Sequence, residues 1–258
     1  MNTFKLSNED AHLFYHDFPG ALPTLVMLHG LGSASSSWFP RAARHPRLQG
    51  HRCVLVDLLG YGYSDRPPDH SYTMESQADN VASLLDHLAL RDCVIIGHSM
   101  GGSIAILLAH ARPDLASQLV IAEGNLDPGP GFVSGRIAAV SEQAFVDEKY
   151  AQFIAQMSDA GYHDYAGTLR ASDPRCLHRS AVSLIADRSP TYRDCLYAFS
   201  GARTYVFGEH TLPDPDEQVL RERGMDIRIV PRAGHDMMGD NPDGFACAVA
   251  DAIANAHA

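Results

Sequence analysis

Residues 93–109 read CVIIGHSMGGSIAILLA, and this stretch decides the fold. An apolar run at 93–96 is followed by Gly97-His98-Ser99-Met100-Gly101 and then by residues with helical spacing. A Gly-x-Ser-x-Gly motif between a strand and a helix is typical of a sharp turn that exposes the hydroxyl of its central serine. The glycines stand where a side chain would collide with the turn, and the helix N-terminus favours negative charge. The pattern predicts Ser99 as a nucleophile.

Short apolar runs and helix-like segments alternate along most of the chain. The apolar runs cover residues 25–28, 53–56, 93–96, 119–122, 204–207 and 227–230. Most of these runs are too uniformly apolar for half-exposed strands, and they fit strands that are covered on both faces. Strands alternating with helices predict an α/β fold with a doubly wound, mostly parallel sheet. In such sheets ligands bind at the carboxyl ends of the strands.

Residues 126–200 break this alternation. The segment has no clear buried strand, yet it holds nine of the chain's aromatic residues. We expect a helical cap, or lid, that covers an apolar pocket, with Phe132 among the residues that bind the substrate. The core domain then comprises residues 1–125 and 201–258.

Three further segments carry a family resemblance. Residues 28–32 read LHGLG, residues 57–67 read DLLGYGYSDRP, and Gly234-His235 follows the last apolar run. Together with the serine motif, these segments resemble the α/β-hydrolase fold superfamily over nearly the whole chain outside 126–200. The resemblance implies that the cap follows the sixth strand of the fold. It also implies that Asp57 and Arg66 shape the turn after their strand.

The resemblance further implies a triad of serine, histidine and acid, and an oxyanion hole of two backbone N–H groups. His235 is the expected base, because it comes last in the chain order of the family and histidine titrates near neutral pH. The expected oxyanion donors are the N–H groups of Met100, directly after the nucleophile, and of Leu31. The neighbouring residues expected to contact the substrate are His29, Gly30 and His98.

The acid of the triad departs from the family pattern. The family usually carries it as Gly-x-x-Asp, but residues 208–211 read GEHT, which puts Thr211 in that place. A hydroxyl cannot stabilise an imidazolium as a carboxylate does. Glu123 is the preferred candidate, because its strand is expected to lie beside that of the nucleophile and some branches, haloalkane dehalogenases among them, carry a glutamate there. The alternatives are Asp214 or Asp216 on a longer loop, or a serine–histidine pair without an acid.

The composition limits which kinds of partner the protein is expected to bind. The net charge of −11 disfavours nucleic acid, and no basic run or long apolar stretch indicates a membrane or a signal peptide. Five cysteines without a CxxC pair are expected to be buried free thiols, which favours a cytoplasmic protein. No metal-binding or dinucleotide motif is present, so no cofactor is expected. The expected partner is a small-molecule substrate, bound by a monomer or homodimer.

These features predict a serine hydrolase that cleaves a carboxylic ester, or a related lactone or thioester, through an acyl-enzyme. The aromatic cap favours a substrate with an apolar portion, and a serine nucleophile argues against dehalogenation. Cleavage of a carbon–carbon bond next to a carbonyl stays open. The alternatives on the same fold are a non-hydrolytic ligand-binding or receptor protein, and a lyase that uses the same groups as a base.

Overall fold

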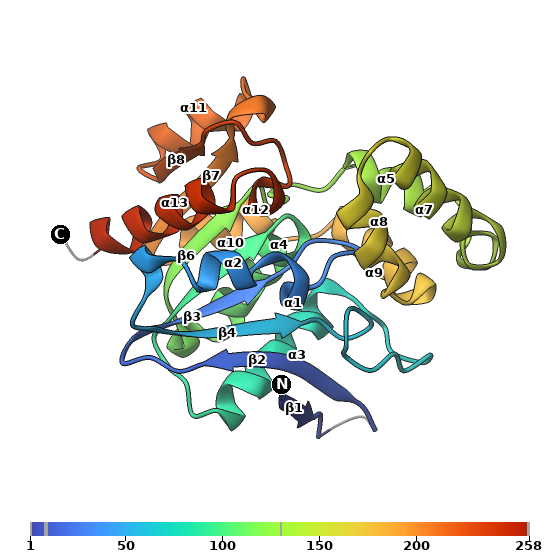
Figure 1. Cartoon of the computed structure of the whole chain (residues 1–258), viewed down its shortest axis with the longest axis horizontal. Helices are drawn as coiled ribbons and strands as arrows, with labels where there is room; N and C mark the ends of the chain where they lie inside the picture. The colour runs from blue at the N-terminus through green and yellow to red at the C-terminus, as the bar shows by residue number, and fades with distance from the viewer. Residues whose placement is uncertain (1, 8–9, 130, 257–258) are drawn as a thin grey trace.

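One eight-stranded sheet forms the centre of the structure (Figure 1). This computed structural model describes residues 2–7, 10–129 and 131–256. In spatial order the strands are β1 (Asn2–Lys5), β2 (His12–Phe18), β4 (His51–Asp57), β3 (Leu22–Leu28), β5 (Cys93–His98), β6 (Ala116–Ala122), β7 (Ala202–Gly208) and β8 (Asp226–Val230). The pairs β1–β2 and β2–β4 are antiparallel, and every pair from β4 to β8 in this order is parallel. The predicted α/β fold with a mostly parallel sheet is confirmed.

Helices cover both faces of the sheet, which explains the uninterrupted apolar runs. In β3, Val26 and Leu28 pack in the cluster that includes α3 (Met74–His87) and α4 (Met100–Ala111). Leu25 and Met27 alternate with them and pack in a second cluster with α2 (Pro40–Ala43) and α13 (Pro242–Asn255). Because successive side chains of a strand point to opposite faces, each apolar run supplies both cores.

The remaining helices of the core are short. They are α1 (Ser35–Trp38), η1 (Pro46–Leu48), η2 (Pro113–Leu115), η4 (Glu209–Thr211), α11 (Pro215–Glu222) and α12 (Met237–Asp240). Within the described ranges, no helix has both the length and the apolar character that crossing a bilayer requires.

The segment 126–200 contains helices and, in its described part, no strand. Its helices are α5 (Phe132–Ala138), α6 (Glu142–Ala144), the π-helical turn η3 (Phe145–Lys149), α7 (Tyr150–Asp159), α8 (His163–Arg170), α9 (Pro174–Ile185) and α10 (Tyr192–Ala198). In Figure 1, α5, α7, α8 and α9 form a lobe beside the sheet, whereas α10 packs against α4 of the core. We propose that α5–α9 form the cap and that α10 belongs to the core. The outer ends of the predicted core, residues 1 and 258, lie outside the described residues.

A fully buried carboxylate fixes the loop after β4. Asp57 Oδ1 accepts the backbone N–H of Ser36 at 2.8 Å, and Oδ2 accepts the Ser36 hydroxyl at 2.8 Å and the backbone N–H of Tyr63 at 3.1 Å. The backbone passes close to this carboxylate at Gly62, where a Cβ would lie 2.2 Å from Asp57 Oδ2 and where φ is +53°. Asp57 therefore ties the 58–66 loop to α1 and acts in the structure of the turn.

Asp57→Ala should lower the free energy of unfolding by about 2–4 kcal/mol, because the buried carboxylate is lost and two backbone N–H groups and the Ser36 hydroxyl lose their acceptor. Urea unfolding followed by circular dichroism measures this change. Asp65→Ala in the same loop is the matched control, since its side chain is 51% exposed. A loss as large in the control as in Asp57→Ala would contradict the assignment.

Candidate active site

Ser99 forms the turn between β5 and α4. Its backbone has φ +52° and ψ −122°, in a region that residues with a side chain rarely adopt. The turn fits only because its flanks lack side chains: a Cβ at Gly97 would lie 2.3 Å from the carbonyl oxygen of Gly101. The Ser99 N–H donates to the carbonyl of Ala122 on β6 at 2.9 Å. The strained conformation is therefore held by the neighbouring strand.

Two backbone N–H groups next to Ser99 are without an acceptor among the described hydrogen bonds. One belongs to Met100, the first residue of α4, and the other to Leu31 in the loop after β3. The β3 loop comes this close because of Gly30, where a Cβ would lie 3.0 Å from His98 Nδ1 and 3.1 Å from Ser99 Cβ. Two such N–H groups beside the serine are candidate donors for an oxyanion hole.

His235 and Glu123 are joined by a short hydrogen bond. Nδ1 of His235 lies 2.6 Å from Oε2 of Glu123, although 112 residues separate them in the chain. Glu123 follows β6 with φ +46°, and its N–H donates to the carbonyl of Val206 on β7 at 3.1 Å. The glutamate side chain is 10% exposed and the imidazole 50% exposed. The structure thus brings together the predicted base and the preferred candidate acid.

The second carboxylate oxygen of Glu123 accepts a hydrogen bond from Thr211, which stands at the position where the family usually carries its acid. Oε1 accepts the Thr211 hydroxyl at 2.5 Å and the Gly208 N–H at 2.8 Å. Asp214 instead caps α11 by accepting the N–H of Asp216 at 2.8 Å, and the Asp216 side chain pairs with Arg193 at 2.7 Å. Both alternative aspartates are therefore engaged away from the imidazole.

Desolvation and hydrogen bonding oppose each other within the histidine–glutamate pair. Removal from water lowers the pKa of His235, but the hydrogen bond and charge of Glu123 outweigh it, so the pKa of His235 is raised. Desolvation raises the pKa of Glu123, but the hydrogen bonds from His235, Thr211 and Gly208 and the charge of His235 outweigh it, so the pKa is lowered. The pair combines a stable carboxylate with an imidazole of increased basicity.

His98 supports the loop that carries His235. Its Nε2 donates to the carbonyl oxygen of His235 at 2.9 Å, and the two rings lie 4.8 Å apart between centroids. Burial, together with the nearby charge of His235, lowers the pKa of His98 to about 3, so this ring is neutral. His98 also lines the cavity described below, so the predicted substrate contact has a second role in holding the histidine loop.

His29 is buried behind the β3 loop and is not among the residues that line the cavity. Its Nδ1 donates to the carbonyl of Gly30 at 2.8 Å, and its Nε2 accepts the N–H of Leu58 at 3.0 Å. Both ring nitrogens are thus used by the backbone. The structure gives His29 a place in shaping the loop rather than in contacting a substrate.

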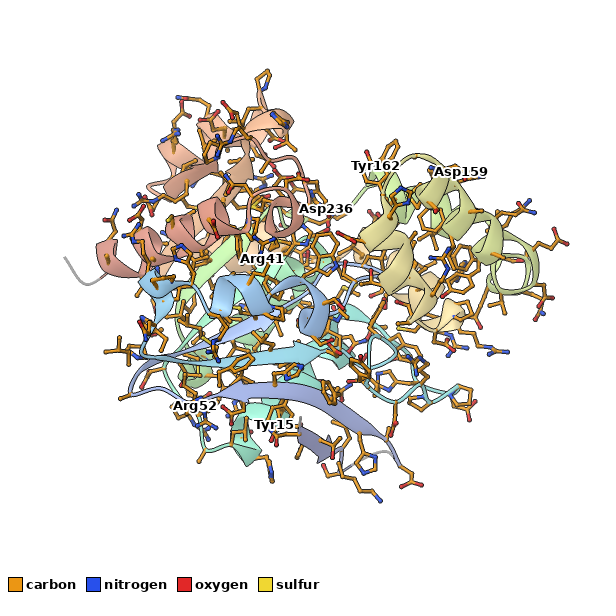
Figure 2. The ribbon with its side chains drawn as sticks, viewed as in Figure 1. Tyr15, Arg41, Arg52, Asp159, Tyr162 and Asp236 are labelled. Carbon is orange, nitrogen blue, oxygen red and sulfur yellow. The ribbon has the colours of Figure 1, made fainter. Side chains whose placement is uncertain are left out.

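Ser99 and His235 face one cavity of about 770 Å³ between the core and the cap. The hydrogen bonds of the described residues include none between Ser99 Oγ and His235 Nε2. Such nucleophile–base contacts are often loose without substrate and tighten when it binds. Figure 2 labels Asp236 of the core and Tyr162 of the cap, and both residues line this cavity.

The wall of this cavity is mainly apolar, with several carboxylates. Its apolar and aromatic residues are Leu31, Leu126, Phe132, Val133, Met157, Tyr162, Tyr165, Leu184, Tyr205 and Phe207. Phe132 is 83% exposed and therefore stands at the mouth. The acidic residues are Glu123, Asp127, Asp214, Asp216 and Asp236, and no Lys or Arg is found among the described lining residues. Desolvation, with smaller contributions from the charges of Asp240 and Glu123, raises the pKa of Asp236 against the opposing charge of His235.

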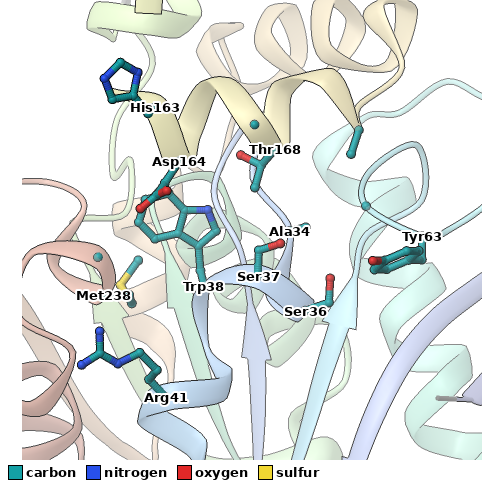
Figure 3. A pocket seen from close by; sticks show the side chains of 14 residues that line it. Ala34, Ser36, Ser37, Trp38, Arg41, Tyr63, His163, Asp164, Thr168 and Met238 are labelled. Atoms are coloured by element: carbon teal, nitrogen blue, oxygen red, sulfur yellow. The ribbon is translucent and has the colours of Figure 1, made fainter. Parts of the chain in front are cut away.

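A second cavity of about 540 Å³ lies on the other side of α8. Figure 3 shows His163, Asp164 and Thr168 of α8 above Ser37 and Trp38 of α1. None of the residues predicted for the site lines this second cavity. No cluster of three or more His, Cys, Asp or Glu side chains suited to a metal ion occurs in the described part of the chain.

Comparison with known proteins identifies relatives of the chain. The chain is 29% identical to sn-1-specific diacylglycerol lipase ABHD11 of Mus musculus, in an alignment that covers 92% of this chain and 83% of that protein. It is 34% identical to a 2-hydroxy-6-oxononadienedioate/2-hydroxy-6-oxononatrienedioate hydrolase of Paraburkholderia xenovorans, over 50% of this chain and 45% of that protein. A thermophilic esterase from Thermogutta terrifontis superposes with a TM-score of 0.82 at 22% identity, covering 100% of this chain and 99% of the esterase. Residues 23–218 match the sequence profile of the alpha/beta hydrolase fold, and the chain belongs to that family.

Proposed function

We propose that this hydrolase cleaves a carboxylic ester with an apolar portion, using Ser99 as nucleophile, His235 as base and Glu123 as acid. The observation that carries the proposal is the 2.6 Å bond between His235 and Glu123 at a cavity that also exposes Ser99. Family membership and the two free N–H groups beside the serine support the same chemistry. The diacylglycerol lipase among the relatives is, by its name, an enzyme that acts on esters.

The first step is acylation of the serine. Ser99 Oγ attacks the ester carbonyl carbon while Nε2 of His235 takes its proton. Glu123 stays ionised, because the pKa of its carboxyl is lowered, and it stabilises the imidazolium through the hydrogen bond to Nδ1 of His235. The N–H groups of Leu31 and Met100 donate to the oxyanion. When the bond to the alcohol breaks, His235 returns the proton to the leaving oxygen.

Water completes the reaction in the second step. The same imidazole takes a proton from a water molecule as that water attacks the acyl carbon, and a second oxyanion forms at the same N–H groups. Collapse of this intermediate breaks the bond to Ser99, which regains its proton from His235. The products are an alcohol and a carboxylic acid, and the protein returns to its starting state.

The cavity wall favours an uncharged substrate. The apolar residues of the wall, such as Leu126 and Phe207, would bind a hydrocarbon portion of the substrate, because burying apolar surface is favourable. A dioate such as the one named for the Paraburkholderia relative would meet Asp236 and Glu123 without a lysine or arginine among the described lining residues. Like charges in a partly desolvated site repel. An ester is therefore preferred over an anionic carbon–carbon substrate.

A fluorophosphonate probe should label the protein at Ser99, and p-nitrophenyl esters from acetate to decanoate should be hydrolysed with a preference for longer acyl chains. Ser99→Ala should abolish labelling and lower turnover by at least about 10³ because no nucleophile remains. Ser134→Ala, which removes another hydroxyl of the same cavity, is the matched control and should keep both activities. Labelling that persists in Ser99→Ala rejects the nucleophile, and labelling without cleavage of any ester favours a ligand-binding protein.

Glu123→Gln should lower kcat by about 10³–10⁴, because a neutral amide no longer stabilises the imidazolium. Asp214→Asn and Asp216→Asn should stay near the parent protein, since their side chains cap α11 and pair with Arg193. Steady-state kinetics on one ester measures all three variants.

A double variant that moves the carboxylate from position 123 to position 211 tests the assignment more sharply. Thr211 Oγ1 lies 2.5 Å from Glu123 Oε1, so an aspartate at 211 would put a carboxylate close to where Glu123 now acts. Glu123→Gln with Thr211→Asp should recover part of the activity lost in Glu123→Gln alone. A large loss in either aspartate variant, with none in Glu123→Gln, would reject the assignment.

The pH profile reports the base. His235 must be neutral to accept the serine proton, so kcat/KM should fall as the pH drops through its pKa, which is raised above the ordinary 6.5. Glu123→Gln removes the two larger influences that raise this pKa and leaves desolvation and the smaller effect of the Asp236 charge, so the acidic limb of the remaining activity should move to lower pH. Asp214→Asn should leave the limb in place. An unmoved limb in Glu123→Gln would contradict the coupling.

A further inference from the structure

The cap makes a direct hydrogen bond to the loop that carries one oxyanion donor. The hydroxyl of Tyr165, on α8, donates to the carbonyl oxygen of Leu31 at 3.0 Å. The Leu31 N–H is one of the two groups that the proposed mechanism aims at the oxyanion. A cap side chain, Tyr165, thus makes a hydrogen bond to Leu31, the residue whose N–H the proposed mechanism uses.

The hydrogen bond from Tyr165 acts on a turn whose conformation depends on the orientation of its central peptide. Ser33 N–H donates to the carbonyl of Gly30 at 3.1 Å, and Gly32 has φ +74°. Leu31 is not among the residues with positive φ, so residues 30–33 form a type II turn with glycine at its third position. A type II turn differs from a type I turn by a flip of its central peptide, which here contains the Leu31 carbonyl. The Tyr165 hydroxyl holds this peptide in its flipped orientation.

The helix packs onto the turn without space for a further atom. A Cβ on Gly32 would lie 2.6 Å from Leu169 Cδ2 and 2.9 Å from the Tyr165 hydroxyl oxygen. On its other side α8 borders the second cavity, which Gly167 and Thr168 help to line (Figure 3). Tyr165 itself lines the catalytic cavity. With open space on both flanks, α8 meets the β3 loop through Tyr165 and Leu169.

We propose that Tyr165 is a positioning residue that orients the oxyanion loop, so that closure of α8 completes the oxyanion hole. This inference rests on the proposed serine mechanism. When α8 lies in place, the Leu31 carbonyl is held by the Tyr165 hydroxyl and the Leu31 N–H faces the cavity. When α8 moves away, the Leu31 carbonyl loses this anchor, and Leu31, whose own N–H belongs to the preceding peptide, is held less firmly. The cap then controls transition-state stabilisation as well as access.

Tyr165→Phe tests the proposal because it removes only one hydroxyl. Loss of an oxyanion donor costs about 10²–10³ in turnover, and a donor that is loosened rather than removed should cost about 10-fold in kcat. KM should stay within about twofold, since a transition-state interaction is lost. A trifluoromethyl ketone with the same acyl chain, which forms an oxyanion on Ser99, should bind more weakly by the same factor as kcat falls. The primary alcohol with the same chain, which forms no oxyanion, should bind unchanged.

Tyr63→Phe is the matched control. Tyr63 lines the second cavity and not the catalytic one, it is 65% exposed, and its hydroxyl takes part in no hydrogen bond among those of the described residues. Its kinetics should match the parent protein. An unchanged kcat in Tyr165→Phe overturns the proposal, as does a raised KM alone, which would make Tyr165 a substrate contact. Equal weakening of both inhibitors would indicate general loosening and also overturns it. Failure of the serine mechanism is recognised separately, by full turnover in Ser99→Ala.

Discussion

The close approach of three backbone segments at the carboxyl ends of β3, β5 and β6 is the constraint on which the site depends. The β5–α4 turn, the β3 loop and the segment after β6 meet where Gly97, Gly101, Gly30 and Gly124 leave no Cβ between them. Ser99 takes a strained conformation there, and the hydrogen bond from its N–H to Ala122 on β6 holds it. Such strain persists only where surrounding structure fixes it. The same crowding that strains the serine brings two N–H groups beside its hydroxyl.

The proposed acid, Glu123, stands on a different strand from the one that usually carries the acid in the family. The carboxylate comes from β6 at Glu123, and the end of β7 supplies the Gly208 N–H and the Thr211 hydroxyl that bind it. The backbone of Glu123 adopts φ +46°, which turns its side chain toward β7 and the histidine loop. Three donors then hold one carboxylate, so its negative charge is stable although it is largely buried. The local geometry conserves the electrostatic function through a different residue.

The sequence predicts what depends on local pattern and chain order. Ser99 follows from two glycines between a strand and a helix, and Glu123 follows from its place after the neighbouring strand. The pattern does not reveal β1 and β2, because polar residues such as His16 and Asp17 interrupt the apolar run of β2. It could not distinguish α10, which packs on the core, from the cap helices around it. The sequence pattern also does not reveal the contacts of Thr211 and Tyr165, because these contacts depend on the three-dimensional fold and not on spacing along the chain.

The shortage of positive charge in the catalytic cavity has a consequence for turnover. In the proposed reaction an ester enters as a neutral molecule, but the acid that it yields is ionised at neutral pH. Beside Asp236 and Glu123, and with no described Lys or Arg in the wall, that new anion is repelled as soon as it forms. This repulsion leaves the equilibrium of the reaction unchanged, but it weakens binding of the product, speeds its release and keeps accumulated acid from occupying the site.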